Sequence, residues 1–201
     1  SDHTEGLFDV LEHLKVKMLI IPYLSDETCF RKLIDAAEDK GVPVARCYEG
    51  AVIRLDDRTF MEVLNPPSDV SCDPDSLNNT SLVLRLCYDG TSVLFTGDAE
   101  AEAEERMLAG GREISSDVIK IAHHGSESST GEEFLGKVSP KAAVISVGRN
   151  NFGHPSDAVL DLLEEKGILC LRTDQCGAIL LKSDGKRIKI KRTVPESELD
   201  R

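Results

Sequence analysis

The sequence predicts an α/β fold with a mixed β-sheet, from the order in which helical and extended patterns follow one another. Helix-like segments alternate with short apolar runs along most of the chain, as in layered α/β proteins. Two turn signals, Asp89-Gly90 and Asp184-Gly185, interrupt this alternation with hairpins. Because hairpins join antiparallel strands and crossover helices join parallel ones, the sheet should contain both kinds of pairing.

The first part of the chain opens with a helical pattern over 4–14, followed by a compact apolar strand over 16–22. Ser25 has the position of an N-cap, and the following residues predict a helix over 26–40. Further strands are expected at 43–48, 51–55 and 59–64. Residues 65–80 are rich in Pro, Asp, Ser and Asn, which indicates a long surface loop.

The second part carries the clearer signals. Strands over 81–88 and 92–96 flank the first hairpin turn. Thr130 begins a segment with the spacing of a capping box, and Ser156 has the position of an N-cap before an amphipathic helix. The other elements are expected in this order: a helix at 100–109, strands at 118–122, 142–147 and 168–172, and hairpin strands at 178–182 and 187–191.

Composition restricts the class of protein. No domain boundary is evident, so residues 1–192 are expected to form one domain and 193–201 a polar tail. No apolar run approaches the ~20 residues that a membrane helix needs, and no signal peptide is expected. The six cysteines are scattered without a C-x-x-C pair, which predicts reduced thiols rather than a disulfide framework.

The net charge of -12 bears on the substrate. A strongly acidic surface repels nucleic-acid phosphates, so the overall field does not indicate a DNA-binding protein. Any polyanionic substrate would need a local attraction, such as bound metal ions or a basic patch.

Residues able to bind a metal fall at predicted strand ends or in the turns that follow, and they are Asp2-His3, Asp98, His123-His124 and His154. Such strand ends are where sites of α/β proteins usually lie. Taken singly, each has an ordinary structural alternative. Asp2 suits a helix dipole, Asp98 suits an N-cap, and His154 suits a turn.

The histidine pair is harder to explain by structure alone. Successive side chains of a strand point to opposite faces, so both rings reach one point only if the strand ends there. Gly125 follows at once and permits backbone conformations closed to other residues. One alternative is a buried histidine with a backbone hydrogen bond beside an exposed one. The other is a pair of rings turned into a cleft.

Together, these imidazoles and carboxylates suit zinc, manganese or iron, and an aspartate can bridge two such ions. Two metal ions can lower the pKa of a shared water and hold a phosphate or acyl group during displacement. Ser126 is not set in a G-x-S-x-G elbow, so a serine triad is not indicated. No phosphate-binding glycine loop is present in the sequence either.

The order D-H, T-G-D, H-H-G-S, G-H-P resembles the metallo-β-lactamase fold, and more narrowly the C-terminal domain of ComEC-type DNA-internalisation competence proteins. The likeness extends to "NNTSLVLRL", "LFTGDAEAEAEERML", "DVIKIAHHGSESSTGEEFL", "AAVISVGRNNFGHP" and "LRTDQCGAILL". It implies a metallo-β-lactamase-like αββα sandwich with mixed sheets. Asp2-His3 resemble the last two residues of the family's H-x-D/H-x-D-H motif. The chain is therefore expected to start inside that motif and to lack the first strands of the fold.

The resemblance also implies the site. Two divalent ions, zinc or manganese, are expected in the intact parent, and the site is expected to be partial or empty in this chain. The implied metal ligands are Asp2, His3, Asp98, His123, His124 and His154. Asp98, His124 and His154 are the implied catalytic residues, and Ser126 and Asn151 the implied substrate contacts. The separate histidine usual in the superfamily is missing between His13 and His123, and either Asn78-Asn79 or the doubled histidine compensates.

The resemblance implies a metal-dependent hydrolase, a phosphodiesterase or DNase that uses a metal-activated hydroxide. Its expected substrate is single-stranded DNA, and its expected partner is the membrane-embedded remainder of a bacterial inner-membrane protein, of which this chain would be a soluble domain. Two alternatives stay open. One is a metal-free, non-catalytic structural or interaction module, and the other is a hydrolase of another ester or a lactam on the same fold.

Overall fold

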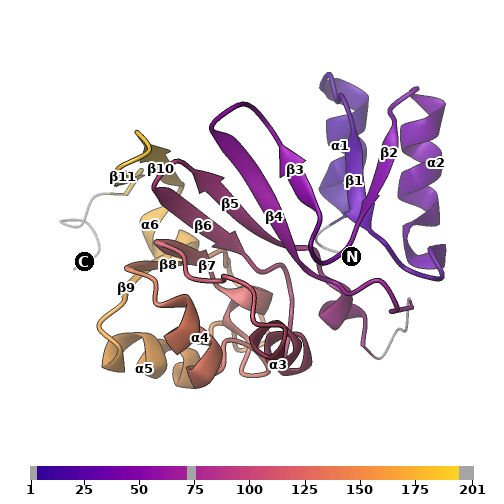
Figure 1. The fold of residues 1–201 in the computed structure, drawn as a ribbon. Coiled ribbons are helices and arrows are strands. Elements are labelled where there is room, and N and C mark those ends of the chain that lie inside the picture. Colours follow the sequence, from indigo (N-terminus) through magenta and orange to yellow (C-terminus); the bar gives the residue numbers. More distant parts are fainter. Residues whose placement is uncertain (1–3, 72–75, 195–201) are drawn as a thin grey trace.

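A computed structural model describes residues 4–71 and 76–194 of the chain. Its centre is a seven-stranded mixed sheet in the order β3-β4-β5-β6-β7-β8-β9, as expected for an α/β fold (Figure 1). Pairing is antiparallel from β3 to β6 and parallel from β6 to β9. The strands span Val52–Arg54, Thr59–Asn65, Val83–Tyr88, Thr91–Phe95, Val118–Lys120, Ala142–Ile145 and Leu169–Arg172.

Two smaller sheets accompany the central one. β1 (Leu19–Pro22) and β2 (Val44–Cys47) pair in parallel, and β10 (Ile179–Ser183) and β11 (Ile188–Arg192) form an antiparallel hairpin. The β1–β2 pair lies beside α1 (Glu5–His13) and α2 (Arg31–Asp39) in Figure 1, and apolar residues of these elements form a hydrophobic core of their own.

Three helices cover one side of the central sheet, below it in Figure 1: α3 (Ala101–Ala109), α4 (Glu132–Val138) and α5 (Asp157–Glu165). Their apolar faces pack on β6, β7 and β8 in the main core, where Phe134, Leu135 and Leu163 are almost fully buried. Each such side chain contributes about 1.5–3 kcal/mol of burial free energy. The helices thereby fix the carboxyl ends of the parallel strands relative to one another.

Short helical turns complete the fold, at η1 (Thr28–Phe30), η2 (Leu77–Thr80), η3 (Ala122–Gly125) and α6 (Thr173–Cys176). None of the described helices is long and apolar enough to cross a membrane.

Several sequence predictions are confirmed. Tyr88 pairs with Thr91 across the two-residue turn at Asp89-Gly90, and Asp89 adopts a left-handed φ of 47°. The second hairpin turns between Ser183 and Ile188. The Ser156 hydroxyl accepts a hydrogen bond from the Val159 amide and caps α5 as predicted.

Three local predictions are wrong. Ser25 is not an N-cap, since its hydroxyl donates to the Val70 carbonyl and α2 starts only at Arg31, after η1. Thr130 does not form a capping box, because α4 starts after Gly131 without a side-chain cap. Cys29 is disulfide-bonded, so the expectation of reduced thiols throughout does not hold. The other described cysteines, Cys47, Cys87, Cys170 and Cys176, are free.

Candidate metal and substrate site

The predicted site residues of the described chain converge at the carboxyl ends of β6, β7 and β8. Asp98 follows β6, the histidine pair follows β7, and the segment that leads to His154 follows β8. Since these three strands run parallel and are neighbours, the segments that follow them meet at one edge of the sheet. The strand-end reasoning from the sequence therefore holds for these residues.

We call residues 121–131 the histidine turn. β7 ends at Lys120, and His123 and His124 then both adopt left-handed backbone conformations, with φ of 46° and 55°. Such conformations cost non-glycine residues about 1–3 kcal/mol each, so the surrounding contacts must hold them in place. Gly125 continues the turn with a φ of 85°, and a Cβ atom at that position would lie 2.6 Å from Pro155 Cβ. The turn thus requires glycine.

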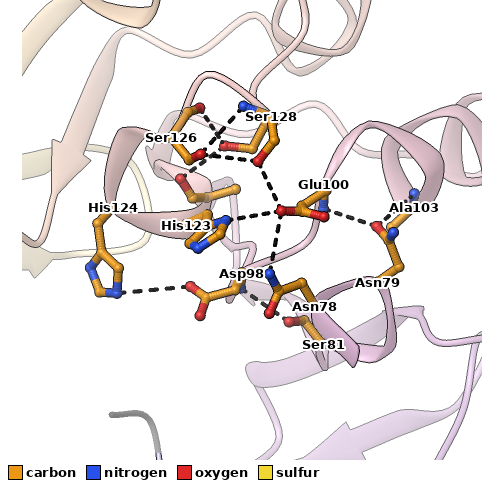
Figure 2. A network of polar contacts seen from close by, with 12 residues as sticks. Asn78, Asn79, Ser81, Asp98, Glu100, Ala103, His123, His124, Ser126 and Ser128 are labelled. Atoms are coloured by element: carbon orange, nitrogen blue, oxygen red, sulfur yellow. Dashed lines mark hydrogen bonds and ion pairs between the residues drawn. The ribbon is translucent and has the colours of Figure 1, made fainter. Parts of the chain in front are cut away.

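His124 is oriented by a backbone carbonyl. Its Nδ1 lies 2.6 Å from the Ser146 carbonyl oxygen, so Nδ1 carries the proton and Nε2 keeps its lone pair. Nε2 lies 3.9 Å from Asp98 Oδ1 (Figure 2). That separation is too long for a hydrogen bond between these two atoms, and it brings an imidazole nitrogen and a carboxylate oxygen to face one another.

His123 is oriented by a carboxylate that the sequence reasoning missed. Glu100 Oε1 lies 3.2 Å from His123 Nδ1 and also accepts hydrogen bonds from Ser128 Oγ at 2.8 Å and Asn78 Nδ2 at 3.3 Å (Figure 2). Glu100 follows Asp98 by two residues, in a segment that looks like an ordinary acidic start of a helix. Its partners come from two other parts of the chain, the histidine turn and η2, so no local pattern indicates the role.

Asn79 caps helix α3 from a distance. Its Oδ1 accepts the amide hydrogens of Glu100 and Ala103, at 3.1 and 3.2 Å (Figure 2). Glu100 is the N-cap residue, so the structural alternative in which Asp98 caps this helix is wrong. Asp98 is held instead through its amide, which donates to Ser81 Oγ at 3.1 Å. Its carboxylate faces His124.

His154 joins the same cluster. Its ring centroid lies 5.5 Å from that of His123 and 6.0 Å from that of Phe152, whose ring stacks on it at 21°. Partial burial lowers the pKa of His154, and the neighbouring His123 and His124 lower it further, while Asp98 acts in the opposite direction. Neutral imidazole is the form that can bind a metal through its lone pair.

The remaining predicted residues differ in their surroundings. Ser126 is buried and its hydroxyl lies 3.0 Å from Ser128 Oγ, within the histidine turn. Asn151 is exposed, in the segment over 148–154 that we call the aromatic loop. Asp2 and His3 lie outside the described residues. The roles assigned to these four residues, like those assigned to Asp98 and the other histidines, stay predictions.

The donor chemistry fits a divalent cation, but the donor set is incomplete. Both histidines of the pair direct Nδ1 to an oxygen, as metal-binding histidines almost always do, and leave Nε2 as the possible ligand atom. Within 4–71 and 76–194, however, no three His, Cys, Asp or Glu side chains are close enough together to hold a metal ion. Within the described residues, the side chains that could bind a metal are thus fewer than a metal site requires.

Comparison with known proteins shows which family the chain resembles. A family model described as the metallo-beta-lactamase superfamily matches residues 74–149. The chain is 42% identical to ComE operon protein 3 of Bacillus subtilis, over 89% of this chain and 23% of that protein. It is 38% identical to Competence protein ComA of Neisseria gonorrhoeae, over 66% of this chain and 20% of that protein. It is 40% identical to Recombination protein 2 of Haemophilus influenzae, over 43% of this chain and 11% of that protein.

The chain thus spans less than a quarter of the length of each of these relatives. Among solved structures, a mutant of CmlA beta-hydroxylase matches with a TM-score of 0.52 at 11% identity, over 81% of this chain and 39% of that one. An identity this low shows the shared fold alone. The chain belongs to the metallo-β-lactamase superfamily, in the group that contains the ComEC-type competence proteins.

Proposed function

We propose that this chain is a metal-dependent phosphodiesterase domain that cleaves DNA within a competence protein. The observation that carries the proposal is the arrangement of Asp98 and His124, whose Oδ1 and Nε2 atoms face one another 3.9 Å apart. The protonated Nδ1 of His124 is held by the Ser146 carbonyl, so the lone pair of Nε2 is directed toward the carboxylate.

In this proposal Asp98 and His124 hold a divalent cation, with His123, His154, Asp2 and His3 as further ligands. Manganese or zinc suits such nitrogen and carboxylate donors. When bound, two such ions polarise a phosphate and lower the pKa of a coordinated water. Other groups hold the ligand side chains in place. Glu100 is the main one, because it accepts hydrogen bonds from His123, Ser128 and Asn78.

The names of the relatives support a nucleic-acid context. Two are called competence or ComE operon proteins and one a recombination protein. Single-stranded DNA is the substrate that we propose on this basis, with a longer, membrane-embedded parent protein as the structural partner. Because the chain has a net charge of -12, bound cations would also supply the local attraction that a polyanion needs.

The test is cleavage of labelled single-stranded DNA by the purified chain with Mn²⁺. We expect cleavage that chelation stops and that Asp98→Ala abolishes. Asp161→Ala is the matched control, since Asp161 is an exposed carboxylate on α5, remote from the histidine turn. Full activity of Asp98→Ala would overturn the proposal. Parallel assays with a chromogenic lactam and a small phosphodiester define the class of ester or amide that is hydrolysed.

The incomplete donor set favours one second candidate, a metal-free module that acts only through structure or interaction. Metal analysis of the purified chain separates the two. Tightly held divalent ions that survive dialysis would exclude the metal-free module. A chain that neither retains nor binds Mn²⁺ or Zn²⁺ would exclude the hydrolase for this chain.

A further inference from the structure

The aromatic loop (148–154) encloses one side of a cavity of about 380 Å³ beside the histidine turn. Its walls include His124 and His154 of the proposed metal site, together with Arg149 and Phe152. The proposed hydrolysis assigns no role to these last two residues. Their positions therefore need a separate explanation.

Phe152 is 81% exposed, the most exposed large apolar side chain among the described residues. Phenylalanine is among the residues most often buried, and a ring that lies mostly in water does not contribute the free energy of burial. Its only described aromatic neighbour is His154, which stacks on it with a centroid separation of 6.0 Å. A flat ring beside the site, largely open to solvent, is a surface on which another flat group can stack.

The loop holds this ring in place through Asn150. The Asn150 side chain donates to the carbonyl oxygens of Gly148 and His154 and accepts from the amides of Phe152 and His154, at 2.8–3.2 Å. At the start of the loop, the Val147 amide donates to Thr173 Oγ1 at 2.7 Å. These hydrogen bonds fix the backbone on both sides of Phe152, so its exposure is built into the loop.

Arg149 adds a positive charge on the same loop. Six other arginines form ion pairs with Asp or Glu, and they are Arg46, Arg58, Arg85, Arg106, Arg112 and Arg172. Arg149 is exposed and forms no ion pair with any residue that the structure describes. Arg31, Arg54 and Arg187 also form no ion pair within the described residues, but Arg149 differs from them because it lines the cavity beside the histidine turn. Its guanidinium is available to a phosphate.

We propose that the aromatic loop is a nucleotide-binding subsite, in which Phe152 stacks on an unpaired base of single-stranded DNA and Arg149 contacts a neighbouring phosphate. The proposal rests on the proposed function for its substrate class. Bases in a duplex are already stacked on one another, whereas a base on a single strand is available to an aromatic side chain. The subsite would therefore favour single-stranded over double-stranded DNA and place the strand next to His124 and His154.

The test measures binding without chemistry. A fluorescein-labelled oligothymidylate of about 12 nucleotides is titrated with the purified chain, once in EDTA and once with Ca²⁺ in place of Mn²⁺, and anisotropy gives the affinity. We expect Phe152→Ala to weaken binding about 10-fold, since stacking contributes about 1–3 kcal/mol per base. Phe152→Leu should weaken binding as much, whereas Phe152→Trp should retain it. Leu180→Ala is the matched control, because Leu180 is also exposed (59%) but lies on the C-terminal hairpin.

Arg149→Gln tests the phosphate contact. It should reduce the slope of log affinity against log salt concentration by about 0.7, the value for one phosphate contact on a single strand. An oligomer in which abasic sites replace the bases should bind the native chain as weakly as the normal oligomer binds Phe152→Ala. Circular dichroism confirms that each variant is folded.

The outcomes separate this proposal from the proposed function. If the chain cleaves DNA with Mn²⁺ but Phe152→Ala binds the oligomer as tightly as the native chain, the subsite is wrong and the hydrolase stands. If binding depends on Phe152 but nothing is cleaved, the hydrolase is wrong and the subsite stands. Absence of measurable binding by the native chain, both in EDTA and with Ca²⁺, would overturn the subsite.

Discussion

The histidine turn and the aromatic loop lie side by side but are built in opposite ways. The histidine turn is held from outside: Glu104 accepts the amide hydrogens of Thr130 and Gly131, at 2.6 and 2.8 Å, and Glu100 holds His123. The aromatic loop is held mainly by its own Asn150, and it leaves its largest side chain in solvent. The first region is thus a rigid support for the side chains that we propose as metal ligands, and the second exposes the ring that we propose as a contact for substrate.

The comparison predicts that substitutions in the histidine turn, or in the residues that hold the turn and its histidines in place, reduce stability, whereas substitutions in the aromatic loop reduce binding. Urea denaturation measures the loss in the free energy of unfolding. We expect this loss to decrease in the order Gly125→Ala, Glu104→Gln, Asn79→Ala and Asn150→Ala.

Gly125→Ala should have the largest effect. Its new Cβ would lie 2.6 Å from Pro155 Cβ at a φ of +85°, so both overpacking and backbone strain oppose it. We expect a loss of about 3 kcal/mol. Gly136→Ala is the control, since Gly136 lies within α4 and a Cβ atom added there would meet no other atom within 4 Å. It should be neutral or stabilising by up to about 1 kcal/mol. Equal losses in the two variants would contradict the claim that the turn is tightly constrained.

Glu104→Gln should cause the second-largest loss in the free energy of unfolding. Glu104 is only 3% exposed, and its two carboxylate oxygens accept two amide hydrogens, whereas a glutamine offers one oxygen acceptor. Leaving one buried amide without its partner should cost about 1–3 kcal/mol.

The substitution Glu104→Gln also changes how the stability of the chain depends on pH. Burial raises the pKa of Glu104 above 4.5, and the hydrogen bonds from Gly131 and Thr130 only partly oppose the increase. The folded chain therefore keeps this proton at pH values where the unfolded chain has lost it. Stability from this group is present in full below pH 4.5 and is lost as the pH rises through the folded pKa. The native chain should exceed Glu104→Gln in the free energy of unfolding by less and less as the pH rises through the folded pKa of Glu104. A difference that grows with pH would contradict the raised pKa.

Asn79→Ala should have a smaller effect. Asn79 Oδ1 accepts from the amides of Glu100 and Ala103, so its removal leaves the start of α3 uncapped. Loss of a cap costs about 1 kcal/mol. Because Glu100 also orients His123, we expect weaker Mn²⁺ binding in the same variant. Unchanged stability would show that this distant cap contributes nothing.

Asn150→Ala should have the smallest effect on unfolding, within about 0.5 kcal/mol, because exposed substitutions away from the core change stability little. Its effect should appear instead in oligothymidylate binding, since Phe152 loses the hydrogen bonds that present it. A large loss of stability together with unchanged binding would reverse the distinction between the two regions.

Elements of the fold could be predicted from the sequence wherever the residues that determine them are neighbours in the chain. The turns at Asp89-Gly90 and Asp184-Gly185 and the cap at Ser156 depend on neighbouring residues, and the structure has all three. Thr130 fails as a cap because α4 begins one residue later, with Gly131 as the N-cap residue, and Glu104, 26 positions away, accepts the amides of Thr130 and Gly131 before the helix. The disulfide at Cys29 likewise depends on residues brought together by folding.

The candidate site likewise contains residues that the sequence indicates and one that only the tertiary structure reveals. Asp98 and the histidine pair can be predicted as site residues from the sequence because strand ends meet at one edge of a parallel sheet. Glu100 was missed because its partners, His123, Ser128 and Asn78, belong to distant segments. A carboxylate at the start of a helix has an ordinary explanation in the helix dipole, so only the tertiary structure reveals that it orients a histidine.

The central claim is that Asp98 and His124 hold a divalent cation. Calorimetric titration of Mn²⁺ into the metal-free chain tests it most directly, with Asp98→Ala, His124→Ala and Glu100→Gln as variants. The account predicts saturable binding that Asp98→Ala and His124→Ala abolish and that Glu100→Gln weakens by about 10- to 100-fold, as for other groups that orient a ligand. Binding that is absent in the native chain, or equally tight in Asp98→Ala, would contradict it.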